Sequence, residues 1–443
     1  MIDAPRKVAL DILIKIEKDK GYSNLVLDNF LDKYQFNKQD SAFVTALVYG
    51  VLEHLLTIDY FIEKYSKRDT KKIQQVVLNI MRIGVVQLLF MDKIPESAAV
   101  NEAVKQVQKS GFVYIKGFVN AVLREIARNK NNLEYPSKQK DYNFYLQVVY
   151  SCPSLLINKW MDEYGEQTTV GILESLKTRP PYVIKVNTLK TNTQNLLEII
   201  ENAGLIAKKS ETLKDSIEFE KLPALESFKA FQDGMFYIQD YASMYCCLAV
   251  DAKPGQHVLD MCAAPGGKSF TIAGAMNNSG SITACELFES RNRLIKDGAD
   301  RLGITIINAI QNDSSIHNPS LGLYDKVLCD VPCSGLGVLR RKPEVRYKNV
   351  SELEELPTIQ YKILCEGANH CKISGNLIYS TCTLNKAENE DIVKKFLQEH
   401  TAFIASVLPP IFKSQDNWYI TMFPHINNTD GFFIAVFERK VSK

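Results

Sequence analysis

The stretch HVLDMCAAPGGK, residues 257–268, decides the fold of the C-terminal half of the chain. It begins as a short β run, and Gly266 and Gly267 then lead into a helix that starts near Lys268. Glycines in such a turn let the backbone approach a ligand closely, and the first turn of the helix presents N–H groups that have no partner inside the helix. The stretch therefore predicts a strand, a ligand-binding turn and a helix.

Beyond this stretch, β runs and helical segments keep alternating to about residue 440. The β runs lie at 281–286, 304–313, 324–330, 375–381 and 431–440, and helical patterns lie at 290–302, 353–371 and 388–399. Such alternation predicts an α/β fold with a doubly wound, Rossmann-like sheet. In that fold ligands bind beyond the carboxyl ends of the strands, so the residues that end each strand are the candidate site.

Four predicted strands end in a carboxylate, at Asp260, Glu286, Asp313 and Asp330. Glu286 has the place of the acidic residue that accepts ribose hydroxyls in dinucleotide folds. The glycine turn has neither the dinucleotide nor the P-loop spacing, so it does not fit a triphosphate, and taken alone it is equally well a plain turn. Together with Glu286 and Asp313 it suits a nucleoside without phosphates, such as S-adenosylmethionine.

The N-terminal part of the chain has a different pattern. Up to about residue 130, apolar residues recur at helical spacing in at least five segments, as in Val8, Ile12 and Ile16, which predicts an all-helical domain. The polar stretch NKNNLEYPSKQKDYN, residues 129–143, is typical of an interdomain connection. We therefore predict a helical domain at 1–135, a small α+β, RRM-like module at 145–235 and the catalytic domain at 236–443.

Composition excludes several classes of protein. With 443 residues, 46% hydrophobic and 23% charged, the chain is neither disordered nor fibrous. The longest apolar stretch, 76–91, contains Asn79 and Arg82 and is too short for a membrane span, and the N-terminus does not resemble a signal peptide, so a cytoplasmic protein is expected. Residues 1–140 carry 22 Lys and Arg against 16 Asp and Glu, an excess too small to establish nucleic-acid binding.

Ten cysteines without a secretion signal indicate thiols rather than disulfides. There is no C-x-x-C pair, and the six histidines show no helical metal spacing, so no metal is expected. Most of these cysteines are expected to be small buried hydrophobes. Cys333 and Cys382 are exceptions, because both follow predicted neighbouring strands at the edge where the nucleoside loop lies; singly, each would be interpreted as a buried strand-end thiol.

The motifs DMCAAPGGKS, DVPCSG and YSTCT resemble those of the RNA cytosine carbon-5 methyltransferases of the Nop2/Sun family. YIQDYASM, LRRKPEVRY and PHINNTDGFFIAVF are also similar, so the resemblance covers roughly residues 150–440. In the front half, IPESAAVNEAVKQVQ and GFVNAVLREIAR resemble the NusB-type helical domain of the bacterial member that modifies 16S ribosomal RNA. The resemblance implies a class I methyltransferase domain that uses S-adenosylmethionine and acts on 16S ribosomal RNA; a monomer is expected.

The resemblance also implies a role for each candidate residue. Cys382 is the nucleophile that adds to carbon 6 of cytosine, Cys333 is the base that removes the carbon-5 proton, and Asp330 holds the ring edge, best as a protonated donor to nitrogen 3. An unperturbed thiol is only about 3% ionised at pH 7, so the nucleophile needs surroundings that favour the thiolate. The cofactor residues that follow from the resemblance are Cys262, Ala263, Ala264, Pro265, Gly266, Gly267, Lys268, Glu286 (ribose), Asp313 (adenine) and Asp330.

Three alternatives stay open at this point. A transfer RNA methyltransferase would use the same chemistry, and a DNA cytosine methyltransferase would place its nucleophile at Cys333. A protein of another class, a NusB-like RNA-binding or antitermination protein, would carry an inactive methyltransferase scaffold. The basic run at Arg340, Arg341, Lys342, Arg346 and Lys348, together with Tyr347, suits either an RNA backbone with a stacked base or a solvated loop.

Overall fold

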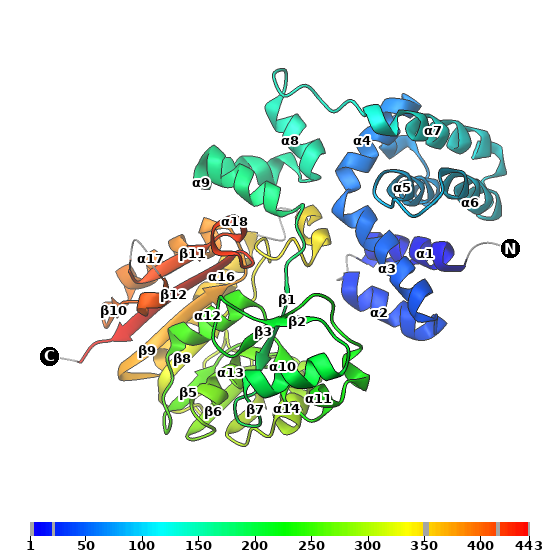
Figure 1. Cartoon of the computed structure of the whole chain (residues 1–443). Helices are drawn as coiled ribbons and strands as arrows, with labels where there is room; N and C mark the ends of the chain where they lie inside the picture. The colour runs from blue at the N-terminus through cyan, green and yellow to red at the C-terminus, as the bar shows by residue number, and fades with distance from the viewer. Residues whose placement is uncertain (1–3, 20–22, 349–353, 413–416, 442–443) are drawn as a thin grey trace. The chain divides into compact units, whose positions relative to one another are not determined.

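The computed structural model describes residues 4–19, 23–348, 354–412 and 417–441, and its contacts divide the chain into two units (Figure 1). The first unit consists of the chain up to Lys177 together with the segment Arg341–Lys348. The second consists of Thr178–Arg340 and the chain that follows Lys348. The predicted domain limits stay predictions.

The first unit is helical, as the apolar spacing predicts. Its helices are α1 (Ala4–Asp19), α2 (Ser23–Tyr34), α3 (Lys38–Glu53), α4 (Leu55–Ser66), α5 (Gln75–Leu89), α6 (Glu96–Lys109), α7 (Lys116–Asn129), α8 (Tyr142–Tyr150) and α9 (Ser154–Ser175).

Helix α5 runs through the core of the first unit, and every residue from Val77 to Leu88 is buried. Arg82, which interrupts this apolar stretch, pairs with Glu17 at 2.6 Å and with Asp59 at 2.7 Å, so its charge is neutralised inside the core. Within the described residues, no helix by itself has both the length and the apolar character to cross a membrane; α3 and α4 reach them only as a pair bent by 76°.

The second unit begins with a small antiparallel sheet. Its strands are β1 (Tyr182–Val186), β2 (Ala207–Lys209), β3 (Ser216–Phe219) and β4 (Phe236–Ile238), in the order β2-β3-β1-β4. Helix α10 (Thr193–Asn202) packs on it with Leu196 and Ile200, against Ile184 and Ile217, while α11 (Lys229–Gln232) leads to β4. The strand β4, at the start of the predicted catalytic region, completes this small sheet.

A larger sheet follows, and it has the predicted doubly wound form (Figure 1). Its strands lie in the order β10-β12-β9-β8-β5-β6-β7, with β11 paired to β12. The strands β5 to β9 run parallel, and β12 runs antiparallel to β9. The strands are β5 (His257–Asp260), β6 (Ser281–Glu286), β7 (Ile307–Gln311), β8 (Tyr324–Asp330), β9 (Cys371–Thr381), β10 (Phe403–Ala405), β11 (Tyr419–Met422) and β12 (Phe432–Arg439).

Helices cover both faces of this sheet, because successive strand residues alternate between two cores. Val258 and Leu328 belong to the core that α12 (Tyr241–Val250), α13 (Gly267–Ala275) and α14 (Glu289–Leu302) close. Leu259 and Val327 belong to the opposite core, with α16 (Leu356–Asn369) and α17 (Glu390–Glu399). Chain order reverses at β5, whose neighbours are β6 and β8, so ligands are expected beyond the carboxyl ends of β5 and β8.

Candidate active site

The two singled-out cysteines meet beyond the ends of β8 and β9. The register pairs Asp330 with Ser380, so both strands end at the same level, and each chain then turns into a loop that carries one thiol. The sulfur atoms of Cys333 and Cys382 lie 3.2 Å apart, and both residues are half-buried. All ten cysteines are free thiols, as the composition predicts.

The environment of the two thiols differs. The adjacent Cys382 sulfur, together with burial, raises the pKa of Cys333 well above its usual value. Either thiol can donate the hydrogen bond between the two sulfur atoms; the raised pKa of Cys333 favours the arrangement in which the Cys333 S–H donates. A nucleophilic sulfur has to be a thiolate, and a neighbouring thiol that keeps its proton is a suitable donor to such a thiolate.

A buried glutamate that the sequence analysis did not single out joins the two cysteine loops. The Glu388 side chain is fully buried and accepts hydrogen bonds from the Ser334 N–H at 2.9 Å and the Ser334 hydroxyl at 2.5 Å. It also accepts from Gln360 at 2.8 Å and Asn385 at 2.7 Å. In the sequence Glu388 begins a polar helical segment, a pattern that indicates exposure, so no local signal identified it.

Further contacts hold the loops together directly. The hydroxyl groups of Ser334 and Thr383 are 2.6 Å apart, and the Gly337 N–H donates to the Cys382 carbonyl at 3.0 Å. A Cβ on Gly337 would lie 1.9 Å from the Gly431 carbonyl oxygen, so only glycine fits there. The distance between the two thiols is therefore fixed by their loops.

Asp330 lies at the end of β8 and accepts hydrogen bonds on both carboxylate oxygens. Lys268 donates at 2.6 Å and the Ser380 hydroxyl at 2.8 Å. Burial alone would lower the pKa of Lys268, but the Asp330 carboxylate, together with Cys246 and Asp240, outweighs burial and raises this pKa well above its usual value. Asp330 is an acceptor here, whereas the sequence analysis expected it to work best as a protonated donor.

A cavity of about 190 Å³ opens beside Asp330 at the switch point of the sheet. Seven of the predicted cofactor residues line this cavity: Cys262, Ala263, Ala264, Pro265, Gly267, Lys268 and Asp330. It is also lined by Asp240 and Asp260, which the sequence analysis did not assign to the cofactor. Gly266 forms the start of α13 with a φ of 106°, where a Cβ would lie 2.4 Å from the Phe270 ring.

The chemistry of this cavity suits a cation. Burial raises the pKa of Asp260 to about 6, although the Ser269 hydroxyl donates to its Oδ2 at 2.7 Å. Its other oxygen, Oδ1, is buried and makes no hydrogen bond. The cavity thus holds three carboxylates, those of Asp240, Asp260 and Asp330, and one of their buried oxygen atoms has no hydrogen-bond donor. Such a site fits the positive ammonium and sulfonium groups of S-adenosylmethionine.

Glu286 and Asp313 do not line this cavity. Glu286 is buried at the end of β6, where its Oε1 accepts from the Phe288 N–H at 3.1 Å and pairs with Arg291 at 3.4 Å. Asp313 accepts from the backbone and the hydroxyl of Ser315, so it holds its own turn. Their predicted contacts with ribose and adenine stay predictions.

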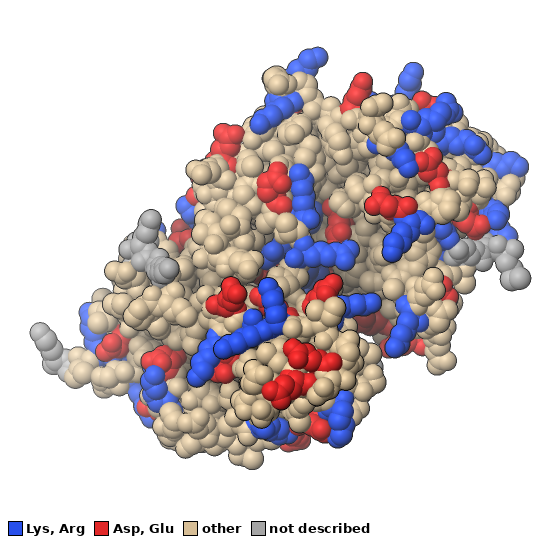
Figure 2. All heavy atoms as spheres, in the orientation of Figure 1, with Lys and Arg blue, Asp and Glu red and all other residues tan. Residues whose placement is uncertain are grey.

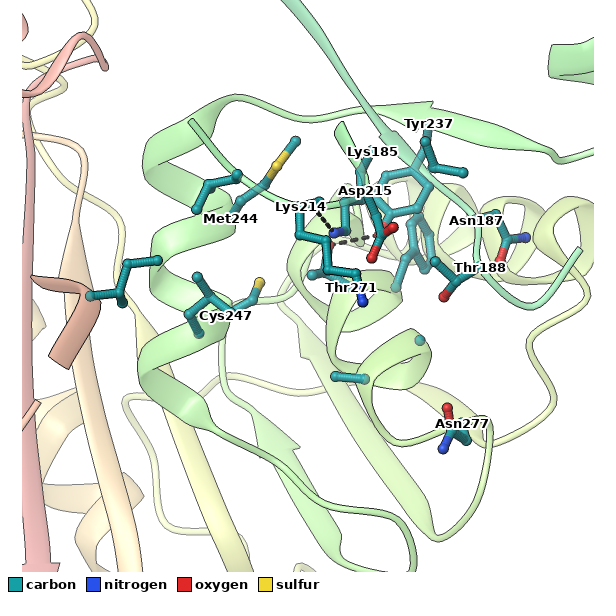
Figure 3. Close-up of a pocket in the computed structure, with 17 residues that line it drawn as sticks. Lys185, Asn187, Thr188, Lys214, Asp215, Tyr237, Met244, Cys247, Thr271 and Asn277 are labelled. Carbon is teal, nitrogen blue, oxygen red and sulfur yellow. Dashed lines mark hydrogen bonds between the residues drawn. The ribbon is translucent and has the colours of Figure 1, made fainter. Parts of the chain in front are cut away.

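A second, larger cavity of about 380 Å³ lies between the small sheet and helices α12 and α13 (Figure 3). Lys185 projects into it and donates to the Lys214 carbonyl at 2.9 Å, while Met244 and Cys247 project from α12. None of the strand-end carboxylates and neither active-site thiol lines it. Despite its size, it is therefore not the candidate cofactor site.

Two arginines of the basic run, Arg340 and Arg346, form neither an RNA-facing surface nor a solvated loop. Arg346 is 4% exposed and donates to the carbonyls of Tyr150 and Ser151, and the Tyr347 hydroxyl lies 3.0 Å from Ser151 Oγ, all within the first unit. In the second unit, Arg340 pairs with the buried Asp430 at 3.1 Å. Both sequence-based interpretations are wrong for these residues, because each guanidinium satisfies buried acceptors. On the face in Figure 2, basic and acidic side chains are interspersed.

Comparisons with known proteins agree with this architecture. The sequence models of three families match: 16S rRNA methyltransferase RsmB/F over residues 247–438, the NusB family over 3–128, and the ferredoxin-like domain of RsmF/B-like methyltransferases over 152–225.

Individual relatives span the whole chain. The chain is 35% identical to "Probable ribosomal RNA small subunit methyltransferase B" of Bacillus subtilis (strain 168), with 98% of each chain covered. It is 29% identical to "Ribosomal RNA small subunit methyltransferase B" of Escherichia coli O1:K1 / APEC, with 94% of each covered. The crystal structure of PH0851 is similar with a TM-score of 0.82 and 26% identity, over 98% of this chain and 99% of that one.

Proposed function

The chain belongs to the family of 16S rRNA methyltransferases RsmB/F, and from that premise we propose that it forms 5-methylcytosine at one cytosine of 16S ribosomal RNA through a covalent adduct of Cys382. The observation that carries the proposal is the 3.2 Å distance between two thiols next to a cavity that suits the methyl donor. Methylation of an amino or a hydroxyl group of RNA would not need two thiols, because these groups are nucleophiles themselves. Methylation of carbon 5 of cytosine needs both a nucleophile that adds to the ring and a base that removes the carbon-5 proton.

Cys382 starts the reaction in this proposal. Its sulfur adds to carbon 6 of cytosine, and the electron pair of the 5,6 double bond makes carbon 5 nucleophilic. When bound, S-adenosylmethionine supplies an electrophilic methyl group to carbon 5. The raised pKa of Cys333 supports the choice of Cys382 as nucleophile, because a Cys333 that keeps its proton can donate to a Cys382 thiolate 3.2 Å away before the bond to carbon 6 forms.

Cys333 completes the reaction as the base. Once Cys382 is bonded to carbon 6, its sulfur carries no charge and no longer raises the pKa of Cys333. Cys333 can then release its own proton to solvent and take the proton from carbon 5. The carbon–sulfur bond breaks, its electrons return as the 5,6 double bond, and Cys382 leaves as a thiolate.

The remaining residues hold the reactants. Asp330, held by Lys268 and Ser380, is positioned to accept from the exocyclic amine of cytosine rather than to donate to nitrogen 3. The turn Cys262–Lys268 and the carboxylate of Asp260 hold the methyl donor from the methionine side, and Glu286 and Asp313 are the predicted contacts for ribose and adenine. The protein is predicted to act as a monomer and without a metal in the reaction.

Methylation assays with the full chain test the substrate. We expect methyl transfer to protein-free 16S RNA, and bisulfite sequencing should map one protected cytosine that appears only with the active protein. Equal or greater activity on transfer RNA would favour the transfer RNA alternative. Absence of S-adenosylmethionine binding in calorimetry, together with absence of methyl transfer, would favour a non-catalytic RNA-binding protein.

A further inference from the structure

A cluster of metal-ligating side chains lies away from the active site, at the C-terminal end of α16. It consists of His317, from the connection between β7 and β8, and Glu366 and His370, which stand four residues apart at the end of α16. One ligand atom of each residue lies within 4.8 Å of the other two. No metal was expected from the sequence, because it has no C-x-x-C pair and no helical spacing of histidines. The tertiary structure brings a loop histidine to a Glu-x-x-x-His pair.

We propose that His317, Glu366 and His370 form a binding site for a divalent transition-metal ion, with zinc as the first candidate. Two imidazoles and one carboxylate form the donor set that zinc uses in three-residue sites, which leave a fourth position for water. Zinc–ligand distances of about 2.0–2.2 Å require the ligand atoms, which now lie within 4.8 Å of one another, to approach each other, and the two imidazole rings, now stacked with 8° between their planes, to turn toward one point. The His317 side chain, 56% exposed, can rotate to make it.

The hydrogen bonds around the cluster already prepare His370 to act as a ligand. His370 is buried, and its Nδ1 lies 3.1 Å from the Gly322 carbonyl oxygen. A carbonyl only accepts, so Nδ1 carries the proton and Nε2 keeps its lone pair. Metal-binding histidines generally use their other ring nitrogen in this way, which fixes both the tautomer and the ring.

The surroundings also favour a cation. Glu366 accepts from His317 Nδ1 at 3.1 Å and from Asn369 at 3.2 Å, so its carboxylate is directed into the cluster. The last turn of α16 adds the partial negative charge of a helix C-terminus. The same helix carries Gln360, which donates to the Pro332 carbonyl and to Glu388, so a metal at one end of α16 would brace the helix that supports the cysteine loops.

Calorimetric titration of the full chain with Zn²⁺ tests the proposal. Because the two active-site thiols can also bind zinc, the titration uses a Cys333→Ser/Cys382→Ser background, in which we expect one ion per chain. His317→Gln and Glu366→Gln should each weaken binding at least about tenfold. The matched control is His425→Gln, an exposed histidine in α18 (Pro424–Asn427), which should leave the affinity unchanged.

Cobalt provides a second readout. Co²⁺ bound by nitrogen and oxygen should show visible absorption without the near-ultraviolet band of thiolate-to-metal charge transfer. In a separate measurement, Zn²⁺ should raise the melting temperature of the Cys333→Ser/Cys382→Ser protein but not that of the same protein with His317→Gln. Since His317 is on the surface, its replacement leaves folding intact. Absence of zinc binding in the Cys333→Ser/Cys382→Ser background, or equal affinity in this background and in both site variants, would overturn the proposal.

Discussion

The sulfur atoms of Cys333 and Cys382 are 3.2 Å apart although the two residues are separated by 49 positions in the sequence. The contact exists because β8 and β9 are adjacent parallel strands that end at the same level. At this distance one sulfur can hold the proton that the other has lost. The pair is therefore arranged for two different roles, and the first two predictions concern that division.

Replacing Cys382 with alanine should abolish methyl transfer, because it removes the sulfur that adds to carbon 6 in the proposed mechanism. We expect turnover on 16S RNA to fall below detection and no denaturation-resistant protein–RNA complex to form. Cys365→Ala, which removes a half-buried thiol on α16, is the control and should retain activity. Alkylation of RNA at the normal rate by Cys382→Ala would contradict the proposed mechanism.

Replacing Cys333 with alanine should stall the reaction after methyl transfer. Addition through Cys382 would proceed, but the carbon-5 proton would stay in place and the adduct could not eliminate. A denaturing gel should therefore show a protein–RNA complex that carries radioactive methyl from S-adenosylmethionine. If the adduct forms in Cys382→Ala and is absent in Cys333→Ala, the two roles are reversed.

Glu388→Gln should disturb the active site without removing a reacting group. The amide replaces one acceptor oxygen by an NH₂ group that faces donors from Ser334, Gln360 or Asn385, and an unsatisfied buried contact of this kind costs about 1–3 kcal/mol. We expect urea unfolding to show that loss, and kcat to fall about tenfold or more with little change in KM for RNA.

Glu390→Gln is the matched control for this experiment. Glu390 is also a buried glutamate, and its side chain accepts from the Thr421 hydroxyl at 2.7 Å. A stability loss in both variants with a kcat loss only in Glu388→Gln would support a positioning role for Glu388. Equal kcat losses in both would mean that the effect is one of general stability.

Binding of S-adenosylmethionine should depend on the protonation of Asp260. Burial raises the pKa of Asp260 to about 6, so the carboxyl holds a proton below that pH and attracts a cation only above it. We expect affinity, measured by calorimetry between pH 5 and 7, to fall roughly tenfold per pH unit below about 6 and to level off above it. Asp260→Asn should bind weakly and without this dependence; a wild-type affinity that is the same at pH 5 and 7 would contradict the assignment.

Arg346→Ala should affect stability rather than RNA binding. The guanidinium is buried and donates to carbonyls at Glu53, Tyr150 and Ser151, at 3.2–3.4 Å. Its loss removes these hydrogen bonds and leaves the Ser151 carbonyl with only the Tyr347 hydroxyl as donor, at a cost of about 2–4 kcal/mol in urea unfolding. Filter binding of RNA, measured well below the melting temperature, should be unchanged; a large loss of affinity with normal stability would restore the interpretation of this segment as an RNA contact.

The sequence by itself determined the class of fold and the chemistry at the strand ends. Alternating β and helical periods predict a doubly wound sheet, because each pattern buries its apolar face in only one way. The turn after Asp260, the carboxylate Asp330 and the two cysteines follow from that sheet, since parallel strands bring their carboxyl ends to one edge. These are local signals, and the structure needs only the strand order to bring them together.

Only the tertiary structure decided the roles of groups that lack a local signal. Glu388 sits in a polar segment and yet is fully buried, while Arg340 and Arg346 sit in a basic run and yet satisfy buried acceptors. His317 reaches Glu366 and His370 from a distant loop. Composition and periodicity report average exposure, whereas a buried polar group is defined by the particular partners around it, and those come from other elements of the fold.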